Sequence, residues 1–190
     1  EIMRLRHLLC ALGAAFCLNA NAAIPASEQT VAVEFYHATL DHYFITAEPN
    51  EIKDLDTGVH KGWTRTGYRF SVIKGGSSYA GTSPVCRFYS PTLDTHFYSA
   101  KKAECDAVKE KFSSVWTFES DEVFRAFEVD PATGVCATDT TGTYRLYNNR
   151  PDVNHRYTDQ LNVFIFMKSK GHIPEGDGSP TLPIAFCTPS

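Results

Sequence analysis

Hydrophobic and polar positions follow a pattern that recurs three times along the chain. A strand-like run of apolar and aromatic residues ends in Tyr, a turn with Asp or Asn follows, and the next run begins with His. The first runs end at Tyr36, Tyr89 and Tyr147, and the second runs begin at His42, His96 and His155. Recurrence at about 55 residues predicts three copies of one supersecondary unit.

Each copy is predicted to contain a β-hairpin, a short helix and a closing strand. Aromatic and β-branched runs that are split by turn-forming residues favour the hairpin. Apolar spacing favours a helix after each hairpin, and these segments are 48–55, 101–111 and 162–170. The predicted fold class is α+β and β-rich, with three hairpin-helix-strand repeats in one compact pseudo-threefold domain. The third copy differs, because His172 replaces a Trp.

The N-terminal segment predicts export. Arg4 and Arg6 precede an apolar run that ends in Ala20-Asn21-Ala22, an arrangement typical of a secretory signal peptide. The run is too short to span a bilayer, so we expect a secreted or periplasmic protein without membrane insertion. The predicted parts are a signal peptide at 1–22, a lead-in at 23–30 and a single three-repeat domain at 31–188, with repeats at about 31–74, 84–129 and 143–188.

Charge and cysteine content narrow the choice of partners. The formal net charge is −4, and such a mildly acidic chain argues against nucleic acid, which favours a clustered basic face. Four cysteines follow the predicted signal peptide, and an even number in an exported chain indicates disulfides. Pairing within repeats predicts Cys86–Cys105 and Cys136–Cys187, whereas the other two pairings would join separate repeats. We expect a monomer without a cofactor.

Two groups of motifs resemble those of a known family. They comprise 85–89 with 96–100 and 103–105, and 144–148 with 154–159. Their spacing, aromatics and cysteines resemble a secreted three-repeat family that is described as a domain of unknown function. That family occurs alone or appended to exported bacterial hydrolases and cell-wall lysins, and in some fungal secreted proteins. The resemblance covers nearly all of 31–188 and implies an accessory module that binds carbohydrate or cell wall. The family's Gly-Trp and Glu-Gly element is kept only in part, at Gly62-Trp63 and Glu175-Gly176.

Catalytic motifs are absent from the sequence, which favours a non-enzymatic function. There is no Gly-x-Ser-x-Gly elbow, His-Glu-x-x-His, phosphate loop or dinucleotide fingerprint. Glu119 and Glu175 do recur at a comparable place, and a catalytic carboxylate pair needs no motif. Three similar units would still require one special unit for catalysis, and none stands out.

Repeated aromatic residues are the candidate binding residues. Tyr and Trp have a flat apolar face and a polar group, which suits stacking on sugars. The alternative is that they pack in the core, as strand aromatics usually do. The candidates are Tyr36, Trp63, Tyr89, Trp116 and Tyr147.

The repeated histidines have two interpretations. If the three repeats met on an axis, His42, His96 and His155 could hold zinc with water as the fourth ligand. The favoured interpretation is structural, because each His follows a turn with Asp whose oxygens can accept a hydrogen bond from the imidazole. We therefore expect no metal. Arg87 and Arg145 are expected to pair with local carboxylates such as those of these turns.

The favoured function is an exported non-enzymatic accessory or binding module for cell-wall or other extracellular glycan. One alternative is a secreted hydrolase that acts on wall or polysaccharide, which two facing carboxylates in a cleft would favour. The other is a structural or protein-interaction domain, which a flat apolar patch would favour.

Overall fold

The computed structural model describes residues 23–190, and the predicted signal peptide lies outside the described residues. The helices are η1 (Ala26–Glu28), α1 (Pro49–Asp56), α2 (Lys102–Lys111) and α3 (Leu161–Ser169). The strands are β1 (Gln29–His37), β2 (His42–Thr46), β3 (Trp63–Ile73), β4 (Thr82–Ser90), β5 (Thr95–Ser99), β6 (Thr117–Phe127), β7 (Thr140–Tyr147), β8 (His155–Thr158), β9 (Ile173–Glu175), β10 (Asp177–Ser179), β11 (Leu182–Ile184) and β12 (Phe186–Pro189). No helix in this part of the chain is long and apolar enough to cross a membrane.

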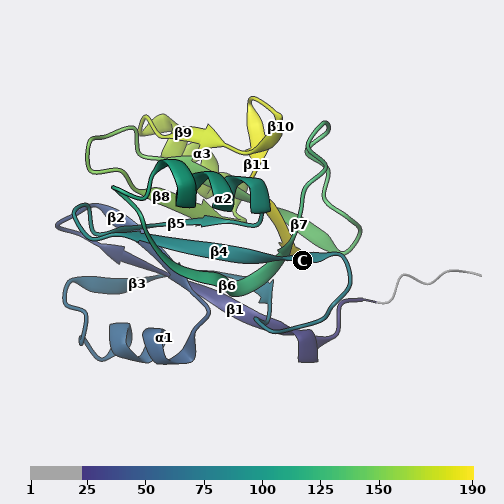
Figure 1. The fold of residues 1–190 in the computed structure, drawn as a ribbon, viewed down its shortest axis with the longest axis horizontal. Helices are drawn as coiled ribbons and strands as arrows, with labels where there is room; N and C mark the ends of the chain where they lie inside the picture. Colours follow the sequence, from purple (N-terminus) through teal and green to yellow (C-terminus); the bar gives the residue numbers. More distant parts are fainter. Residues whose placement is uncertain (1–22) are drawn as a thin grey trace, which may run out of the picture.

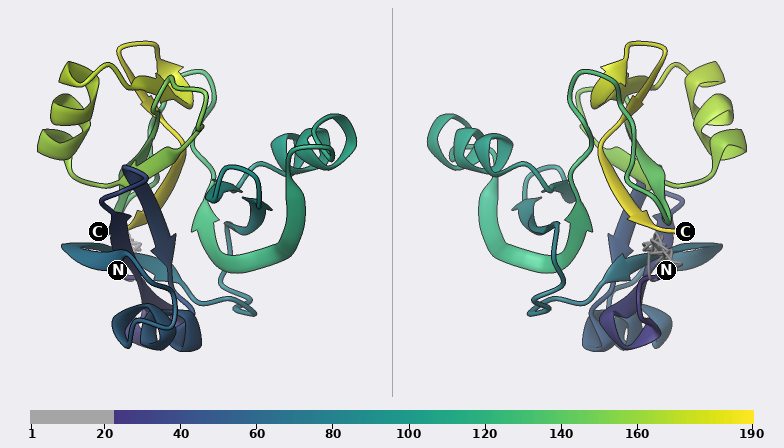
Figure 2. Two further views of the ribbon diagram at one scale, coloured as in Figure 1. Left: turned by 90° about the vertical axis from the view of Figure 1, so that its left-hand side faces the viewer. Right: turned by 90° about the vertical axis from the view of Figure 1, so that its right-hand side faces the viewer.

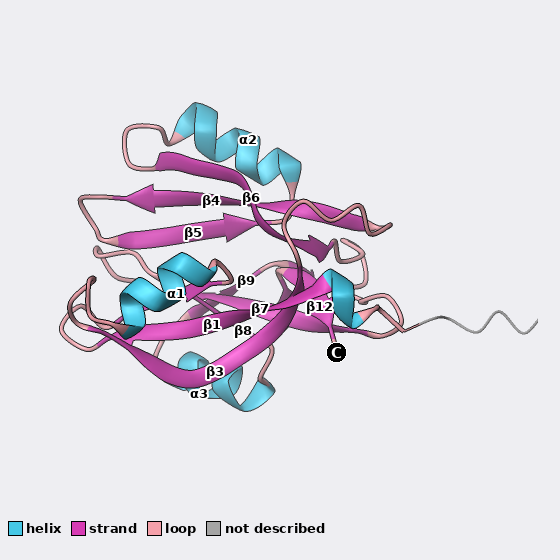
Figure 3. Cartoon of the chain, turned by 90° about the horizontal axis from the view of Figure 1, so that it is seen from below, coloured by secondary structure: helices cyan, strands magenta, loops and turns pink. Residues whose placement is uncertain are grey.

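Ten strands form one antiparallel, barrel-like sheet, which dominates the molecule (Figure 1). The main path runs β2-β1-β3-β6-β12-β7-β8, with β4 and β5 attached at β6 and β9 attached at β7. The two ends of this path approach each other through Asn154, just before β8. Its side-chain amide accepts from the N–H of Tyr43 at 2.8 Å and donates to the Tyr43 carbonyl at 3.0 Å. The sheet is therefore nearly closed. Figure 3 shows α2 and α3 on opposite sides of its strands.

The prediction of three hairpin-helix-strand repeats in a compact pseudo-threefold α+β domain is wrong. Strands from different parts of the chain pair directly, so the sheet is continuous: β3 meets β6 at Ile73 and Arg125, and β12 meets β6 at Cys187 and Phe127. The helices are short and lie outside the strands (Figure 2). The repeated pattern describes local order, whereas the choice of neighbouring strands depends on long-range backbone pairing that the pattern does not encode.

The last segment departs furthest from the predicted plan. The expected closing strand over 171–187 is instead four short strands, β9 to β12. Gly176 interrupts them with φ +146°, and a Cβ there would lie 2.4 Å from the carbonyl oxygen of Ile184. Only Gly fits such a position. The chain then makes the small β10–β11 hairpin before β12 enters the main sheet between β6 and β7.

A hydroxyl residue at the end of the preceding strand organises the start of each α-helix. Each hydroxyl oxygen accepts a hydrogen bond from a backbone N–H two residues later, and these pairs are Thr46 with Glu48, Ser99 with Lys101 and Thr158 with Gln160. Such local bonds fix the turn from strand into helix. The observed helices agree with the predicted segments to within one residue.

The core is aromatic and is shared by strands from all parts of the chain. Tyr98 on β5 and Tyr157 on β8 are both 2% exposed. The hydroxyl of Tyr157 donates to the carbonyl of Tyr98 at 2.9 Å, and the hydroxyl of Tyr98 donates to the carbonyl of Ile45 at 2.6 Å. Three strands that are distant in sequence are thus bonded inside the core, and both buried hydroxyls are satisfied.

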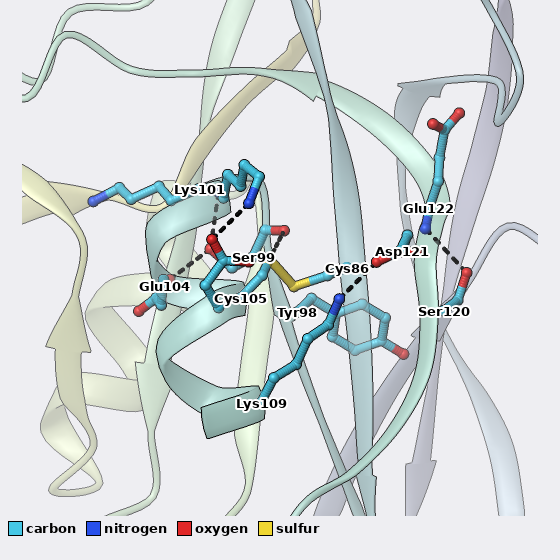
Figure 4. The surroundings of a disulfide bond; sticks show 12 residues. Cys86, Tyr98, Ser99, Lys101, Glu104, Cys105, Lys109, Ser120, Asp121 and Glu122 are labelled. Atoms are coloured by element: carbon cyan, nitrogen blue, oxygen red, sulfur yellow. Dashed lines mark hydrogen bonds and ion pairs between the residues drawn. A yellow bond between two sulfur atoms is a disulfide. The ribbon is translucent and has the colours of Figure 1, made fainter. Parts of the chain in front are cut away.

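Both predicted disulfides are present, and the pairing within segments is confirmed. Cys86 on β4 is bonded to Cys105 on α2, which fastens the helix over its own hairpin (Figure 4). Cys136, in the connection between β6 and β7, is bonded to the fully buried Cys187 on β12. Disulfides are typical of proteins in oxidising compartments.

Candidate functional site

Arg145 on β7 is the centre of a cluster of charged side chains. Its Nη2 lies 2.9 Å from Oε1 of Glu104 on α2, and its Nε lies 2.9 Å from Oε2 of Glu175 on β9. The Nε2 of His155 on β8 lies 3.3 Å from the same Glu175 oxygen. These four residues are the Arg145 cluster. One buried guanidinium thus links α2 to β9.

An open cavity of about 370 Å³ lies beside the Arg145 cluster. All four cluster residues line it, and so do four aromatic residues: Phe97, Phe112, Trp116 and Tyr147. The ring centroid of Trp116 lies 6.0 Å from that of Phe97, and Phe112 is 52% exposed. The cavity therefore combines an aromatic wall with convergent charged groups, a composition that is typical of sites for small polar ligands.

A second cluster has the same composition and is centred on Arg87 of β4. The Nη2 of Arg87 lies 2.7 Å from Oε1 of Glu51 on α1, and its Nε lies 2.7 Å from Oε2 of Glu119 on β6. The Nε2 of His96 lies 3.6 Å from that Glu119 oxygen. These four residues are the Arg87 cluster. A smaller cavity of about 100 Å³ adjoins it at Glu51, and Trp63 lines this cavity.

In the first hairpin, the strand position that corresponds to the two central arginines carries a negative charge instead of a positive one. Glu34 occupies the strand position of Arg87 and Arg145, and it pairs with Arg156 at 2.8 Å for both Nε–Oε1 and Nη2–Oε2. Both side chains are buried, with 1% and 5% exposure. The guanidinium of Arg156 lies 4.0 Å from the ring centroid of Tyr43. Arg156 also lines an open cavity of about 440 Å³ with aromatic residues, but no carboxylate of residues 23–190 lines that cavity, so the pair is not the centre of a third cluster of the same composition.

The carboxylates of the Arg145 cluster are held in their ionised form. Burial acts to raise the pKa of Glu104 and Glu175, but hydrogen bonds and nearby positive charge outweigh it and leave both pKa values below the ordinary range. For Glu104 the hydrogen bonds and the charge come mainly from Arg145. For Glu175 the causes are a hydrogen bond from His155 and the charge of Arg145. At neutral pH neither carboxyl is a proton donor, because each carries its charge.

His96 is held neutral. Burial, followed by the nearby positive charge of Arg87, lowers its pKa from 6.5 to about 3. A His that is protonated in the unfolded chain but not in the fold favours unfolding as the pH falls below 6.5. Glu51 acts in the same direction, but only below about 4.5, because Arg87 and Thr46 lower its pKa despite its burial.

We therefore predict that stability falls between pH 6.5 and 4.5 through His96. In urea melts, the free energy of unfolding should fall by up to about 2 kcal/mol over this range, and His96→Gln should have a flatter pH profile. His60→Gln is the matched control, because His60 is exposed and its replacement should leave the profile unchanged. Parallel profiles for the wild type and His96→Gln would contradict the prediction.

The three repeated histidines have three different sets of partners. Nδ1 of His42 lies 3.0 Å from the carbonyl oxygen of Asp94, and its Nε2 lies 3.6 Å from Oδ2 of Asp152. His96 and His155 belong to the two separate clusters. The His42 contacts are of the kind that the structural interpretation expects, although the turns belong to other hairpins. Within residues 23–190, no group of three or more His, Cys, Asp or Glu side chains is arranged as metal ligands.

The predicted binding tyrosines bond to the turns of their own hairpins. The hydroxyl contacts are Tyr36 to Asp41 Oδ1 at 2.9 Å, Tyr89 to Asp94 Oδ1 at 3.1 Å and Tyr147 to the Arg150 carbonyl at 3.4 Å. These bonds stabilise turns in which Asp41 and Asp94 have positive φ. Of the five predicted binding residues, Trp116 and Tyr147 line the cavity beside the Arg145 cluster, Trp63 lines the one beside the Arg87 cluster, and Tyr36 lines two others of about 630 and 440 Å³.

Glu51 and Glu104 were not predicted, although the sequence contains a signal for them. Each Glu lies five residues after the hydroxyl residue that starts its helix, and accepts a hydrogen bond from it: Thr46 Oγ1 to Glu51 at 2.5 Å, and Ser99 Oγ to Glu104 at 2.6 Å (Figure 4). The prediction that Arg87 and Arg145 pair with carboxylates of the hairpin turns is wrong. Their partners come from the helices and from the strands β6 and β9.

The fold and these sites define a class: a disulfide-bonded, β-rich domain with ionised carboxylate–arginine clusters beside aromatic cavities. More particularly, the chain belongs to the family described as a domain of unknown function (DUF5648), which matches residues 30–176. The resemblance to a family of unknown function is thereby confirmed at that level. No curated protein and no solved structure matches the chain.

Proposed function

We propose that this protein is an exported, non-enzymatic binding module for a neutral cell-wall or other extracellular glycan. The observation that carries the proposal is the cavity in which Trp116 faces the same space as the Arg145 cluster. A pyranose ring has an apolar C–H face and a rim of hydroxyls. The aromatic wall suits the face, and the ionised carboxylates with the guanidinium suit the rim, because charge-assisted hydrogen bonds are strong.

The charge of the site selects among sugars. One guanidinium and two ionised carboxylates leave the Arg145 cluster with a net charge of about −1 before His155 is counted. An acidic sugar would be repelled by Glu104 and Glu175, and a neutral or amino sugar would not. The overall formal charge of −4 acts in the same direction. Glycans built from neutral rings, such as chitin or cellulose, are therefore favoured over polyuronic acids.

The ionised state of the carboxylates favours binding over hydrolysis. A glycosidase needs one carboxyl with a raised pKa that protonates the leaving group. Glu104 and Glu175 have lowered pKa values and share one guanidinium. The facing carboxylates that would suggest a hydrolase are thus in the wrong ionisation state for that chemistry.

Export and an accessory role complete the proposal. The two disulfides fit an oxidising compartment, and the N-terminal sequence has the features of a signal peptide. The family resemblance adds the expectation of a module that acts beside exported hydrolases and wall lysins. Such a module would raise the local concentration of a partner enzyme on an insoluble substrate.

A pull-down on insoluble glycan tests the proposal. Purified protein should be retained on chitin, cellulose or purified bacterial cell wall with micromolar or weaker affinity, which is usual for small contact areas. Trp116→Ala should weaken retention at least about tenfold, because it removes the largest aromatic surface of the cavity. No soluble sugar or peptide should be released from the material.

Phe118→Ala is the matched control, since Phe118 is an exposed aromatic residue on β6 that does not line the cavity. It should bind as the wild type does. If the protein binds neither chitin, nor cellulose, nor purified bacterial cell wall, the proposal is refuted. Release of soluble sugar that disappears in Glu175→Gln would support the hydrolase instead.

A protein partner is the second candidate, and one observation favours it. Helix α3 exposes Leu161, Ile165 and Phe166, with exposed fractions of 49%, 58% and 53%. Apolar surface of this kind occurs at interfaces between proteins. The pull-down separates the two candidates, because no residue of α3 lines the cavity beside the Arg145 cluster and Ile165→Glu should leave glycan retention unchanged.

A further inference from the structure

We infer that the Arg87 cluster is a second glycan site, so that one molecule holds glycan at two separate places. This inference rests on the proposed function of the Arg145 cluster and extends it. Three independent features carry it: the matched chemistry of the two clusters, their placement on opposite faces of one hairpin, and the loss of the same chemistry at the third corresponding place.

The two clusters match contact by contact. In each, the guanidinium binds a helix Glu through both Nη atoms, at 2.9 and 2.7 Å for Arg87 with Glu51 and at 3.1 and 2.9 Å for Arg145 with Glu104. In each, a Trp packs edge-on or tilted against a Phe. The ring centroids lie 5.9 Å apart for Trp63 with Phe44 and 6.0 Å apart for Trp116 with Phe97. Both sites therefore offer an aromatic surface beside ionised carboxylates.

The two sites lie on opposite faces of the β4–β5 hairpin. His96 belongs to the Arg87 cluster, whereas the next residue, Phe97, lines the cavity of the Arg145 cluster. Consecutive side chains of a strand point to opposite faces of the sheet. One sugar ring cannot contact both sites, so each site takes its own segment of glycan.

The sites differ in size, which sets their relative affinity. The cavity at the Arg145 cluster has about 370 Å³ and that at the Arg87 cluster about 100 Å³. The smaller cavity covers less of a pyranose ring and leaves more of it in water. Because less surface is buried, we expect binding at the Arg87 cluster to be about tenfold weaker.

A third site is not expected, because its chemistry is replaced. Glu34 stands in place of the central Arg, Val163 in place of the helix Glu, and His172 in place of the Trp. The Glu34–Arg156 pair is buried on both sides. The described residues 23–190 thus carry two sites of this kind rather than three.

Isothermal titration with soluble chitohexaose and, separately, cellohexaose tests the inference. The wild type should bind at least one of these sugars at two sites that differ about tenfold in affinity. Trp63→Ala should lose the weaker site alone, Trp116→Ala the tighter site alone, and the double variant both. Thermal melting of each variant checks that it is folded.

If the Trp→Ala variants unfold, His60→Trp and Ala107→Trp replace them as variants that block one site each. His60 lines the smaller cavity and Ala107 the larger one, and an added indole should fill each without removing a core side chain. A single site that Trp116→Ala abolishes and Trp63→Ala leaves intact would overturn this inference while preserving the proposed function. No binding of either sugar would overturn this inference, and the pull-down on chitin, cellulose and cell wall would then decide the proposed function separately.

Discussion

Replacing Arg156 with Met is expected to lower the free energy of unfolding by about 3–5 kcal/mol. The substitution leaves the Glu34 carboxylate, which is 1% exposed, without its partner. An unpaired buried charge is costly because the low-polarity interior does not replace its hydration. Arg156→Met also removes the guanidinium that lies 4.0 Å from the ring centroid of Tyr43.

Urea denaturation of a double-mutant cycle measures this effect. Arg156→Met combined with Glu34→Leu should recover much of the loss, since replacing a whole buried pair with apolar residues is often neutral. Arg65→Met is the control, because Arg65 and Asp56 form an exposed pair, and solvent screens such a pair so that its loss should be much smaller. Equal losses in Arg156→Met and Arg65→Met would show that the Glu34 pair is not the buried contact described above.

Removing the Cys136–Cys187 disulfide by a double Ala substitution is expected to cost about 4 kcal/mol. The bridge spans 51 residues, and the closed loop contains β7, β8, α3 and β9 to β11. Without it the unfolded chain gains the entropy of an open loop. For a domain of this size the expected fall in Tm is about 10 °C, which calorimetry would detect.

The Cys86–Cys105 disulfide provides the comparison. It spans 19 residues, so the double Ala variant should lose about 3 kcal/mol, less than its counterpart. A Tm within about 2 °C of the wild type for the Cys136 and Cys187 variant would mean that β12 is held in the sheet by its strand pairing alone.

Local features of the fold could be predicted from the sequence. The helices at Pro49–Asp56, Lys102–Lys111 and Leu161–Ser169 follow from apolar spacing. The β1–β2, β4–β5 and β7–β8 hairpins follow from aromatic runs on either side of a turn. The disulfides follow from pairing cysteines within one predicted repeat. Each of these depends on contacts within about 50 residues.

Long-range features could not be predicted, because no local pattern encodes them. The pairing of β3 with β6 and of β12 with β6 makes the sheet continuous, and it rests on a few backbone contacts between distant strands. The repeated pattern suggested three hairpin-helix-strand units packed together in one pseudo-threefold domain instead. The division of the last segment into β9 to β12 depends on Gly176, whose neighbour Ile184 is eight residues away.

The candidate site was predictable in its aromatic part and not in its charged part. Trp116, Tyr147 and His155 stand out by repetition, and they share one cavity. Glu104 lies on a helix 41 residues from Arg145, so its role emerges only when α2 packs against β7. Glu34 breaks the repeat at one position, which in the sequence resembles ordinary variation but in the fold becomes a buried ion pair.

Nuclear magnetic resonance of the indole N–H groups tests the central claim most directly. Trp63 and Trp116 are the two tryptophans of the chain, so two indole signals are expected, and Trp116→Phe assigns them. The claim that glycan binds beside the Arg145 cluster predicts that the Trp116 signal shifts saturably when chitohexaose or cellohexaose is added. A Trp116 signal that stays unchanged while signals elsewhere in the protein shift saturably would contradict it.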